Sequence, residues 1–550
     1  MPLPSAFLNQ LKEKFVGEVS ADQETLARHS HDASLFEIKP QLVVFPKHSQ
    51  DIQALVQAAT AHRVPLAPYS GGTDMSGGPL TDSVSVDLHR HLTHINPVQD
   101  NTITIQPGAF YHDLEPVTLQ QNLLMPSYPA SREICTVGGM VANDSGGEKT
   151  LKYGKTADYV QKLKVVLSDG REYTFQKLDS PALQQKLRQT DFEGQIYTKI
   201  FNLLEKNYDL IQSAKPHVSK NSTGYALWDV WDRSNQILDL TRLFTGSQGT
   251  LGIITEITFR LIKPHPHSQM IIMFLPDLDK LAPLIKQILR YDPETFESYD
   301  HNTLKLALKF LPQLIRQMKA KNFLALGLSL LPELGLILRG GLPRLILLAE
   351  ITGTDPHEVT TRALAAATSA KSLGIRTRIA HSKTEVQKYW TIRRESFNLL
   401  RKKIKNKRTA PFIDDLIVAP EHLPNFLPRL QALLSQYPDL TYTIAGHIGD
   451  GNFHIIPLMD PTRPDFKTTI DKLSHQVYNL VFEFHGSMSG EHNDGLIRSH
   501  YLEQMYGPQV YDLFKQTKNI FDPHNIFNPG KKINPSWANA SQHLVTSLPV

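Results

Sequence analysis

Two short segments of the chain combine residue types that could bind a metal ion. AGHIGDGNFHIIP, which begins at position 445, places His447 and His454 seven residues apart among glycines. GSMSGEHNDG, which begins at position 486, adds the neighbouring pair Glu491 and His492. Imidazole nitrogens and a carboxylate are ligands that zinc accepts, and three protein ligands leave positions open for a substrate. Four titratable groups are costly to bury together in a hydrophobic core, so the pattern indicates a metal site.

Three glycine-rich loops lie upstream of these segments. The first, SGGTDMSGG from Ser70, follows a strand–helix–strand pattern and leads into the strand-like SVSVDLHR, so it fits neither a Walker loop nor a dinucleotide fingerprint. The second, PSYPASREICTVGGMVANDSGGEKTLKYG, begins at Pro126, and the third, FTGSQGTLGII, begins at Phe244. Backbone N–H groups of such loops can point at an anion, and several of them indicate a cofactor that lies across a domain.

The second half of the chain alternates strands and helices. SQMIIMFLPDLDKLAPLIKQIL predicts a strand and then a helix, while RLILLAEITG, TRIAH and FIDDLIVAP predict further strands. Residues 306–345 form an apolar insertion with six Lys or Arg and a single acid, Glu333. Such a basic, leucine-rich segment either lies in a membrane interface or packs as an ordinary helical insertion, and both interpretations stay open. A transmembrane helix is disfavoured because the apolar stretch is short and contains Pro332.

Composition and charge exclude several classes of protein. The chain has 550 residues, 41% hydrophobic and 20% charged, which suits a globular protein of two or three domains. Its net charge of +4 is too small to indicate nucleic acid, and no zinc-finger, basic-zipper or homeodomain pattern occurs. The single cysteine, Cys135, excludes an intrachain disulfide and is interpreted as a small packed side chain. The N-terminus has no signal-peptide core, so we expect a cytoplasmic location.

The ordered series of motifs resembles the flavin-dependent D-2-hydroxyacid dehydrogenases of the vanillyl-alcohol-oxidase or p-cresol-methylhydroxylase superfamily. This family includes D-lactate, glycolate and D-2-hydroxyglutarate dehydrogenases. The resemblance runs from about Pro40 to Lys532 and rests on SGGTDMSGG, CTVGGMVAN, KYGKT, Lys220-Asn221, Gly224-Tyr225, FTGSQGTLGIITE, GHIGDGNFH, GEHNDGL and FNPGK.

The resemblance implies an α+β fold with several parts. A helical lead-in at 1–35 precedes a two-subdomain FAD-binding domain of the p-cresol-methylhydroxylase type at 36–265. An α+β substrate-cap domain with a ferredoxin-like antiparallel sheet follows at 266–535, with the insertion 306–345 inside it and a loose tail at 536–550.

The resemblance also implies which residues hold FAD. The first glycine loop would hold the pyrophosphate, the second would contact the flavin and ribityl chain, the third would meet the adenine half, and one lysine near the C-terminus would approach the flavin. These residues are Ser70, Gly71, Gly72, Thr73, Asp74 and Ser76; Pro126, Ser127, Thr136, Gly138, Gly139, Asn143 and Tyr153; Ile253 and Ile254; and Lys531.

For the reaction, the resemblance implies a metal-assisted hydride transfer from the substrate to flavin N5. His447, His454 and Glu491 would bind a divalent metal, with zinc expected and manganese or iron as alternatives. His492 would be the general base. Among the catalytic residues, Arg393 would bind the substrate carboxylate, with Arg394 as the alternative and Arg408 as a second candidate cation. Asn452 would hydrogen-bond the substrate.

The implied activity is an FAD-linked dehydrogenase that oxidises a D-2-hydroxyacid and passes electrons to a quinone or a carrier protein. D-lactate is the first expectation and D-2-hydroxyglutarate the alternative. An oxygen-using flavin oxidase and a non-catalytic flavin subunit of a larger complex also remain open, as does peripheral contact with the inner face of a membrane. The oligomeric state is unassigned.

Three positions depart from the pattern of the family. Tyr69 stands where relatives usually have arginine, Gln248 where glutamate is usual, and Asn493 where glycine is commoner. Each departure lies in or next to a segment predicted to bind the cofactor or to act in catalysis.

Overall fold

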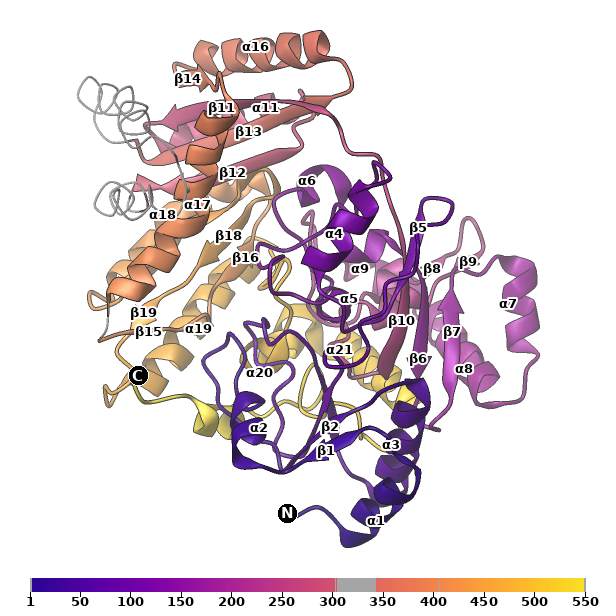
Figure 1. Cartoon of the computed structure of the whole chain (residues 1–550). Helices are drawn as coiled ribbons and strands as arrows, with labels where there is room; N and C mark the ends of the chain where they lie inside the picture. The colour runs from indigo at the N-terminus through magenta and orange to yellow at the C-terminus, as the bar shows by residue number, and fades with distance from the viewer. Residues whose placement is uncertain (1, 302, 304–342, 405, 549–550) are drawn as a thin grey trace.

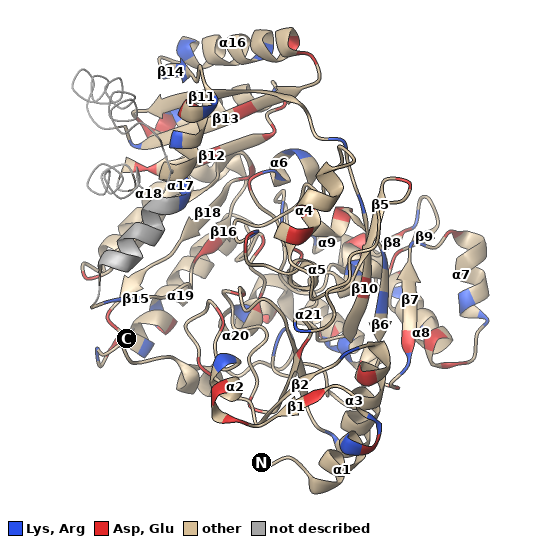
Figure 2. Cartoon of the chain, in the orientation of Figure 1, with Lys and Arg blue, Asp and Glu red and all other residues tan. Residues whose placement is uncertain are grey.

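The computed structural model describes residues 2–301, 303, 343–404 and 406–548 (Figure 1). Almost all of the predicted insertion 306–345 lies outside these residues, so its two interpretations and the predicted membrane contact stay predictions. None of the described helices combines the length and the apolar content needed to span a bilayer. Acidic and basic residues are interspersed along the described elements (Figure 2).

The first subdomain is a four-stranded sheet whose order is β1-β2-β4-β3. Its inner strands carry the runs LVVF and VSVD and are buried on both faces, as expected for parallel neighbours. Helix α3 packs on this sheet, and α1 adds the buried Phe7 and Leu11 to the same core. The bounds are α1 (Ser5–Lys14), β1 (Glu18–Ser20), α2 (Gln23–Arg28), β2 (Leu42–Phe45), α3 (Ser49–His62), β3 (Leu66–Tyr69) and β4 (Val84–Asp87).

The second subdomain is an antiparallel sheet of order β5-β10-β6-β7 with helices along it. Together the two sheets form the expected two-subdomain α+β architecture. The bounds are β5 (Thr102–Ile105), α4 (Tyr111–Leu119), α5 (Val137–Asn143), α6 (Thr150–Tyr153), β6 (Val160–Val166), β7 (Glu172–Gln176), α7 (Ser180–Leu187), α8 (Phe192–Lys206), α9 (Tyr208–Ser213), β8 (Trp231–Asp232), β9 (Ile237–Leu238), α10 (Thr241–Phe244) and β10 (Ile253–Arg260).

The cap is built on a seven-stranded antiparallel sheet of order β14-β11-β13-β12-β17-β18-β16. Along β11, Met270 and Ile272 pack with residues of α17, while Ile271 and Met273 pack on the opposite face with α11 and α16. This period of two is what the apolar run MIIM requires of a strand that is covered on both faces.

The cap therefore has three layers, with α17 on one face of the sheet and α11, α16 and α18 on the other (Figure 1). The bounds are β11 (His267–Leu275), α11 (Leu281–Leu289), β12 (Thr295–Asp300), β13 (Leu345–Gly353), α16 (Pro356–Ser372), β14 (Arg376–Ile379), α17 (Lys383–Lys403), β15 (Arg408–Thr409), β16 (Asp415–Ile417), α18 (Leu423–Ser435), β17 (Ile444–His447), β18 (Asn452–Ile455), β19 (Leu458–Met459) and α19 (Phe466–Glu483).

The chain leaves the second sheet at Arg260 and enters the cap sheet at His267, the interval that contains the predicted boundary at 265/266. After α19 it returns to the first domain, where Phe527 bridges to Leu66. The remaining helices are α20 (Gly495–Arg498), α21 (Leu502–Phe521) and α22 (Trp537–Ala540). The segment predicted as a loose tail is packed as far as Val545, whose N–H donates to the carbonyl of Leu35.

Candidate functional site

The hairpin of β17 and β18 explains the spacing of the two histidines. His447 lies opposite Asn452, and His454 lies opposite Ala445. Residues opposite each other in an antiparallel pair share a face, and so do residues two apart on one strand. The tight turn through Gly451, at φ 73°, therefore brings His447 and His454 to the same face of the cap sheet.

Glu491 joins the two histidines from a distant loop. Its Oε1 lies 2.8 Å from His447 Nε2 and 3.3 Å from His454 Nε2. The His492 ring stacks on His454 with a centroid distance of 5.1 Å. The three predicted metal ligands and the predicted base thus lie together.

The donor set fits a divalent cation. Ligand atoms of Asp415, His454, Glu491 and His492 all lie within 4.8 Å of one another, a group that includes the predicted base and does not include the predicted ligand His447. His447 lies beside this group, and its Nδ1 faces Glu297 Oε1 at 2.5 Å, which leaves Nε2 directed at Glu491. A hydrogen on Nδ1 leaves a lone pair on Nε2, and a lone pair that faces a carboxylate needs a proton or a cation between them.

The charges of the cluster are set by burial and by close partners. Burial lowers the pKa of His454 to about 4, so its imidazole is neutral, as a metal ligand must be. Burial opposes ionisation of Glu491, but Lys220 and His447 hold the pKa of Glu491 well below its ordinary value. The fully buried Lys220 lies 3.8 Å from Glu491 and 3.5 Å from Asp450.

His492 is held by a buried carboxylate. Its Nδ1 lies 2.6 Å from Asp414 Oδ2, and the other oxygen of Asp414 pairs with the fully buried Arg498. Because a carboxylate accepts, Nδ1 carries the hydrogen and Nε2 is left with the lone pair. This arrangement suits a proton acceptor.

Arg393 and Asn452 lie next to the cluster and differ in how completely their polar groups are hydrogen-bonded. Arg393 pairs with Glu297, which also binds His447, and its Nη2 is buried with no hydrogen-bond partner among the described residues. That donor remains for an anion. The amide of Asn452 is fully buried; it donates to Asp415 and Leu416 and accepts from Lys220.

Arg394, the alternative to Arg393, and Arg408, the second candidate cation, bind other groups of the protein. Arg394 pairs with Glu148 and lies over the Trp390 ring. Arg408 donates to the carbonyl of Ser547 at 3.3 Å.

The three glycine-rich loops contact one another. A Cβ at Gly139 would lie 3.1 Å from Ser70 Oγ and 3.3 Å from Thr136 Oγ1, so the first two loops are in contact. Gln248 of the third loop donates to Asp74, Ser76 and Asn143. The carboxylate of Asp74, the acidic residue of the first loop, therefore accepts a hydrogen bond from the third loop.

The loops also reach the metal-site cluster. A Cβ at Gly146 would lie 2.7 Å from Glu491 Oε2, so the second loop passes directly beside that carboxylate. Hydroxyl groups and glycine backbone at these loops fit an anionic dinucleotide cofactor such as FAD.

The other predicted cofactor residues are placed as follows. The side chains of Ile253 and Ile254 are buried in the core. Strand β10 pairs with β5 only from Ile257 onward, so the backbone groups of Ile253 and Ile254 on the β5 side of the strand are left for a cofactor. The Tyr153 hydroxyl donates to Glu294 of the cap at 2.9 Å. Lys531 is buried and donates to the carbonyl of Leu80 at 2.5 Å. Gly71, Gly72, Thr73, Pro126 and Ser127 lie in loop backbone, and Gly138 lies in helix α5 of the second glycine-rich segment.

Sequence reasoning missed the acids that support the cluster. Asp414 and Asp415 stand in FIDDLIVAP, Glu297 stands in TFESYD, and all three are fully buried. Asp415 accepts from the N–H groups of Glu491 and His492 at 2.7 and 2.8 Å. Adjacent acids inside an apolar strand were the signal that could have pointed to them.

Cys135 is buried and free, and burial raises the pKa of its thiol to about 12. A thiol in that state is a packing group, as the sequence indicated.

Two family profiles match the chain. One, described as an FAD binding domain, matches residues 40–176, and the other, described as the C-terminal domain of FAD linked oxidases, matches residues 264–532.

Several curated proteins are similar over most of this chain. A D-2-hydroxyglutarate dehydrogenase of Pseudomonas putida is 29% identical, over 96% of this chain and 52% of that protein. A glycolate oxidase subunit of Bacillus subtilis is 26% identical, over 92% and 91%. A mitochondrial D-lactate dehydrogenase (cytochrome) of Arabidopsis thaliana is 24% identical, over 97% and 81%. The chain spans about half the length of the first of these relatives.

Solved structures share the fold. A 4-ethylphenol oxidase from Gulosibacter chungangensis matches with a TM-score of 0.67 at 14% identity, over 97% of this chain and 98% of that one. A p-cresol methylhydroxylase matches with a TM-score of 0.66 at 16% identity, over 96% and 95%.

Proposed function

The chain belongs to the FAD-linked oxidases of the p-cresol-methylhydroxylase fold, and we propose that it oxidises a D-2-hydroxyacid to the 2-oxoacid. The observation that carries this proposal is the cluster of His447, His454, Glu491 and His492 directly beside the second glycine-rich loop. Cation ligands and a base next to a flavin loop suit the removal of a hydroxyl proton and of the hydrogen on the adjacent carbon.

Each residue of the cluster has one task in this proposal. His447, His454 and Glu491 hold a divalent metal, which when bound supplies the positive charge that lowers the pKa of the substrate hydroxyl. His492 accepts the hydroxyl proton at Nε2, because Nδ1 is bonded to Asp414. When bound, FAD supplies the acceptor for the hydrogen and electron pair of the substrate Cα–H bond.

Arg393 binds the substrate carboxylate in this proposal. Its unpartnered Nη2 supports this role, since a guanidinium donates well to a carboxylate. The fully bonded amide of Asn452 supports a task in fixing Asp415 and Lys220, with substrate contact left as the weaker alternative.

The proposal also concerns the side chain of the 2-hydroxyacid that is oxidised. The sequence favoured D-lactate, whereas several relatives are named D-2-hydroxyglutarate dehydrogenases. The name of another relative includes the word cytochrome, which supports electron transfer to a carrier protein.

The test is anaerobic bleaching of the FAD-loaded, metal-loaded chain by D- and L-forms of lactate, 2-hydroxyglutarate and glycerate, together with glycolate. We expect one D-acid to bleach the flavin within seconds and its L-form to leave the flavin oxidised. A chain that binds FAD and is bleached by none of these acids would contradict the proposal and favour a non-catalytic flavin subunit. Stoichiometric hydrogen peroxide in air would assign an oxidase.

A further inference from the structure

Asn493 follows the predicted base and takes a left-handed backbone. Its φ is 63°, a region that asparagine tolerates better than most residues, and its side chain is fully buried. Two residues on, Gly495 at φ 50° passes so close to Ser76 that a Cβ there would clash with its carbonyl oxygen. This turn therefore runs along the first glycine-rich loop.

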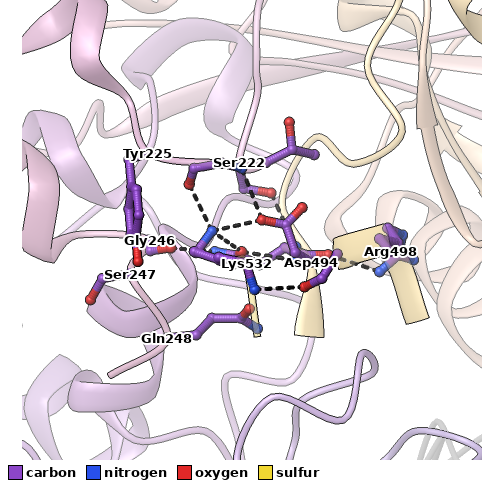
Figure 3. A network of polar contacts seen from close by, with 12 residues as sticks. Ser222, Tyr225, Gly246, Ser247, Gln248, Asp494, Arg498 and Lys532 are labelled. Carbon is purple, nitrogen blue, oxygen red and sulfur yellow. Dashed lines mark hydrogen bonds and ion pairs between the residues drawn. The ribbon is translucent and has the colours of Figure 1, made fainter. Parts of the chain in front are cut away.

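The amide of Asn493 contacts three separate parts of the chain. Its Nδ2 donates to the carbonyl of Asn143 at 3.2 Å and to that of Gly246 at 2.9 Å, which belong to the second and third glycine-rich loops. Its Oδ1 accepts from Lys532 Nζ at 2.7 Å. Figure 3 shows Lys532 between Asp494 and the loop that contains Gly246.

Asn493 completes the coordination of a buried ammonium. Lys532 Nζ donates to Gly224 O, to Asp494 Oδ2 and to Asn493 Oδ1, each at 2.7 Å. An ammonium has three hydrogens, so the asparagine oxygen satisfies the third.

The backbone of Asn493 leads back to the base. Its carbonyl accepts from Arg498 Nη1 at 2.9 Å, and Arg498 pairs with Asp414, which binds the ring of His492. Asn493 thus links the glycine-rich loops to the backbone of its neighbour His492 and, through Arg498 and Asp414, to the ring of His492.

We propose that Asn493 is a positioning residue that fixes His492 relative to the loops that hold FAD. The proposal rests on the proposed function, since it assigns a purpose to that base. The Oδ1 of Asn493 also accepts from the N–H of Asp494 at 2.8 Å. A glycine at this position would keep the left-handed turn and lose all four side-chain contacts, so the side chain can be tested without adding backbone strain.

The test compares Asn493→Gly with Asn528→Gly. Asn528 is also buried and left-handed, at φ 43°, and it also bridges two loops by donating to Gly78 O and Gln248 O. It has no bond to Arg498 or His492 in the described chain. Both variants are measured for their FAD dissociation constant, their unfolding midpoint, the visible circular dichroism of bound flavin, and anaerobic flavin reduction.

At full FAD occupancy, Asn493→Gly is expected to lower the limiting reduction rate by about 10- to 100-fold, with the half-saturating substrate concentration changed less than about threefold. For Asn528→Gly, the limiting reduction rate and the half-saturating substrate concentration are each expected to stay within about threefold of the wild type, at an unfolding midpoint similar to that of Asn493→Gly. Equal rates for the two variants would overturn the proposal.

A second variant covers the case in which Asn493→Gly does not fold. Asn493→Asp keeps the contact with Lys532 but replaces the donor to the Asn143 and Gly246 carbonyls by an acceptor. It is expected to show the same loss of rate, and a wild-type rate would overturn the proposal.

If no 2-hydroxyacid reduces the wild-type flavin, the proposed function fails. The positioning role of Asn493 can still be tested by measurements on the bound flavin that need no substrate. Asn493→Gly should still alter the circular dichroism of bound flavin and weaken FAD binding. An unchanged spectrum and an unchanged dissociation constant would overturn the inference by themselves.

Discussion

Asp414 is the residue that decides which nitrogen of His492 can accept a proton. It lies 2.6 Å from Nδ1 and balances the charge of Arg498 in a fully buried pair. Asp414→Asn would present an amide hydrogen to Nδ1 and so favour the tautomer in which Nε2 carries the hydrogen. We expect flavin reduction to slow by about 10²- to 10⁴-fold, measured by anaerobic stopped flow.

A matched control separates this effect from the loss of a buried charge pair. Asp522→Asn breaks the buried pair with Lys518 and leaves Asp414 and His492 unchanged. Both variants should lose about 3–5 kcal/mol of unfolding free energy. The account is contradicted if the Asp522 variant slows reduction as much as the Asp414 variant does.

His500 gives a pH-dependent stability of known sign. Its ring contacts the rings of Tyr501 and Trp537 at centroid distances of 3.9 and 5.0 Å, and both ring nitrogens are buried with no hydrogen-bond partner among the described residues. Burial lowers the pKa of His500 to about 3, against an ordinary value of 6.5. Below pH 6.5 the unfolded chain binds a proton that the folded chain refuses, so stability falls as pH falls towards 3.

Replacing the ring removes this dependence. Between about pH 7 and pH 5 the wild type should lose about 2 kcal/mol more unfolding free energy than His500→Phe, as urea titrations would measure. Parallel curves for the two proteins would show that His500 is not buried as a neutral ring.

The residue types of the site were readable from sequence, but their partners were not. Glycine-bent histidines and a Glu-His pair predicted the cluster, because those groups are rare together without a task. Asp414 is 78 residues from His492, and Glu297 is 150 residues from His447. No local pattern links positions so far apart.

At the scale of elements, the β17–β18 turn fixes the distance between the two histidines. Gly451 has φ 73°, and a Cβ there would clash with the carbonyl oxygen of Val418. Gly451→Ala should cost about 3 kcal/mol through backbone strain and overpacking, and it should reduce bound metal. Thermal unfolding and metal analysis of the purified protein measure both effects.

Gly530 supplies the control for left-handed strain alone. It has φ 80°, and a Cβ there would meet no atom within 4 Å. Gly530→Ala should cost about 1 kcal/mol and leave bound metal unchanged. A Gly451→Ala protein as stable as Gly530→Ala would contradict the packing argument.

Elements were predicted better than their order. Apolar runs predicted β11, α11 and β13, which have nine residues each, and also the shorter strands β14 and β16. The pairing of β12 with β17, which brings Glu297 beside His447, depends on contacts between distant strands. The packing of residues up to Val545 against Leu35 was missed for the same reason.

At the scale of the molecule, the two domains share the site. Glu294 of the cap binds Lys149 at 2.8 Å and the Tyr153 hydroxyl at 2.9 Å, while Asp292 binds Lys152 at 2.8 Å. These contacts hold the second glycine-rich loop against the cap sheet that carries His447 and His454. The reaction proposed for this chain therefore needs both domains in place.

The measurement that tests the central claim most directly is flavin reduction before and after removal of metal. The FAD-loaded chain is mixed anaerobically with its preferred D-2-hydroxyacid as purified, after treatment with a mild chelator, and after resupply of zinc or manganese. We expect chelation to slow bleaching by about 100-fold or more and metal to restore it, while Glu491→Ala stays slow in every state. Reduction of the metal-free protein at the original rate would contradict the account.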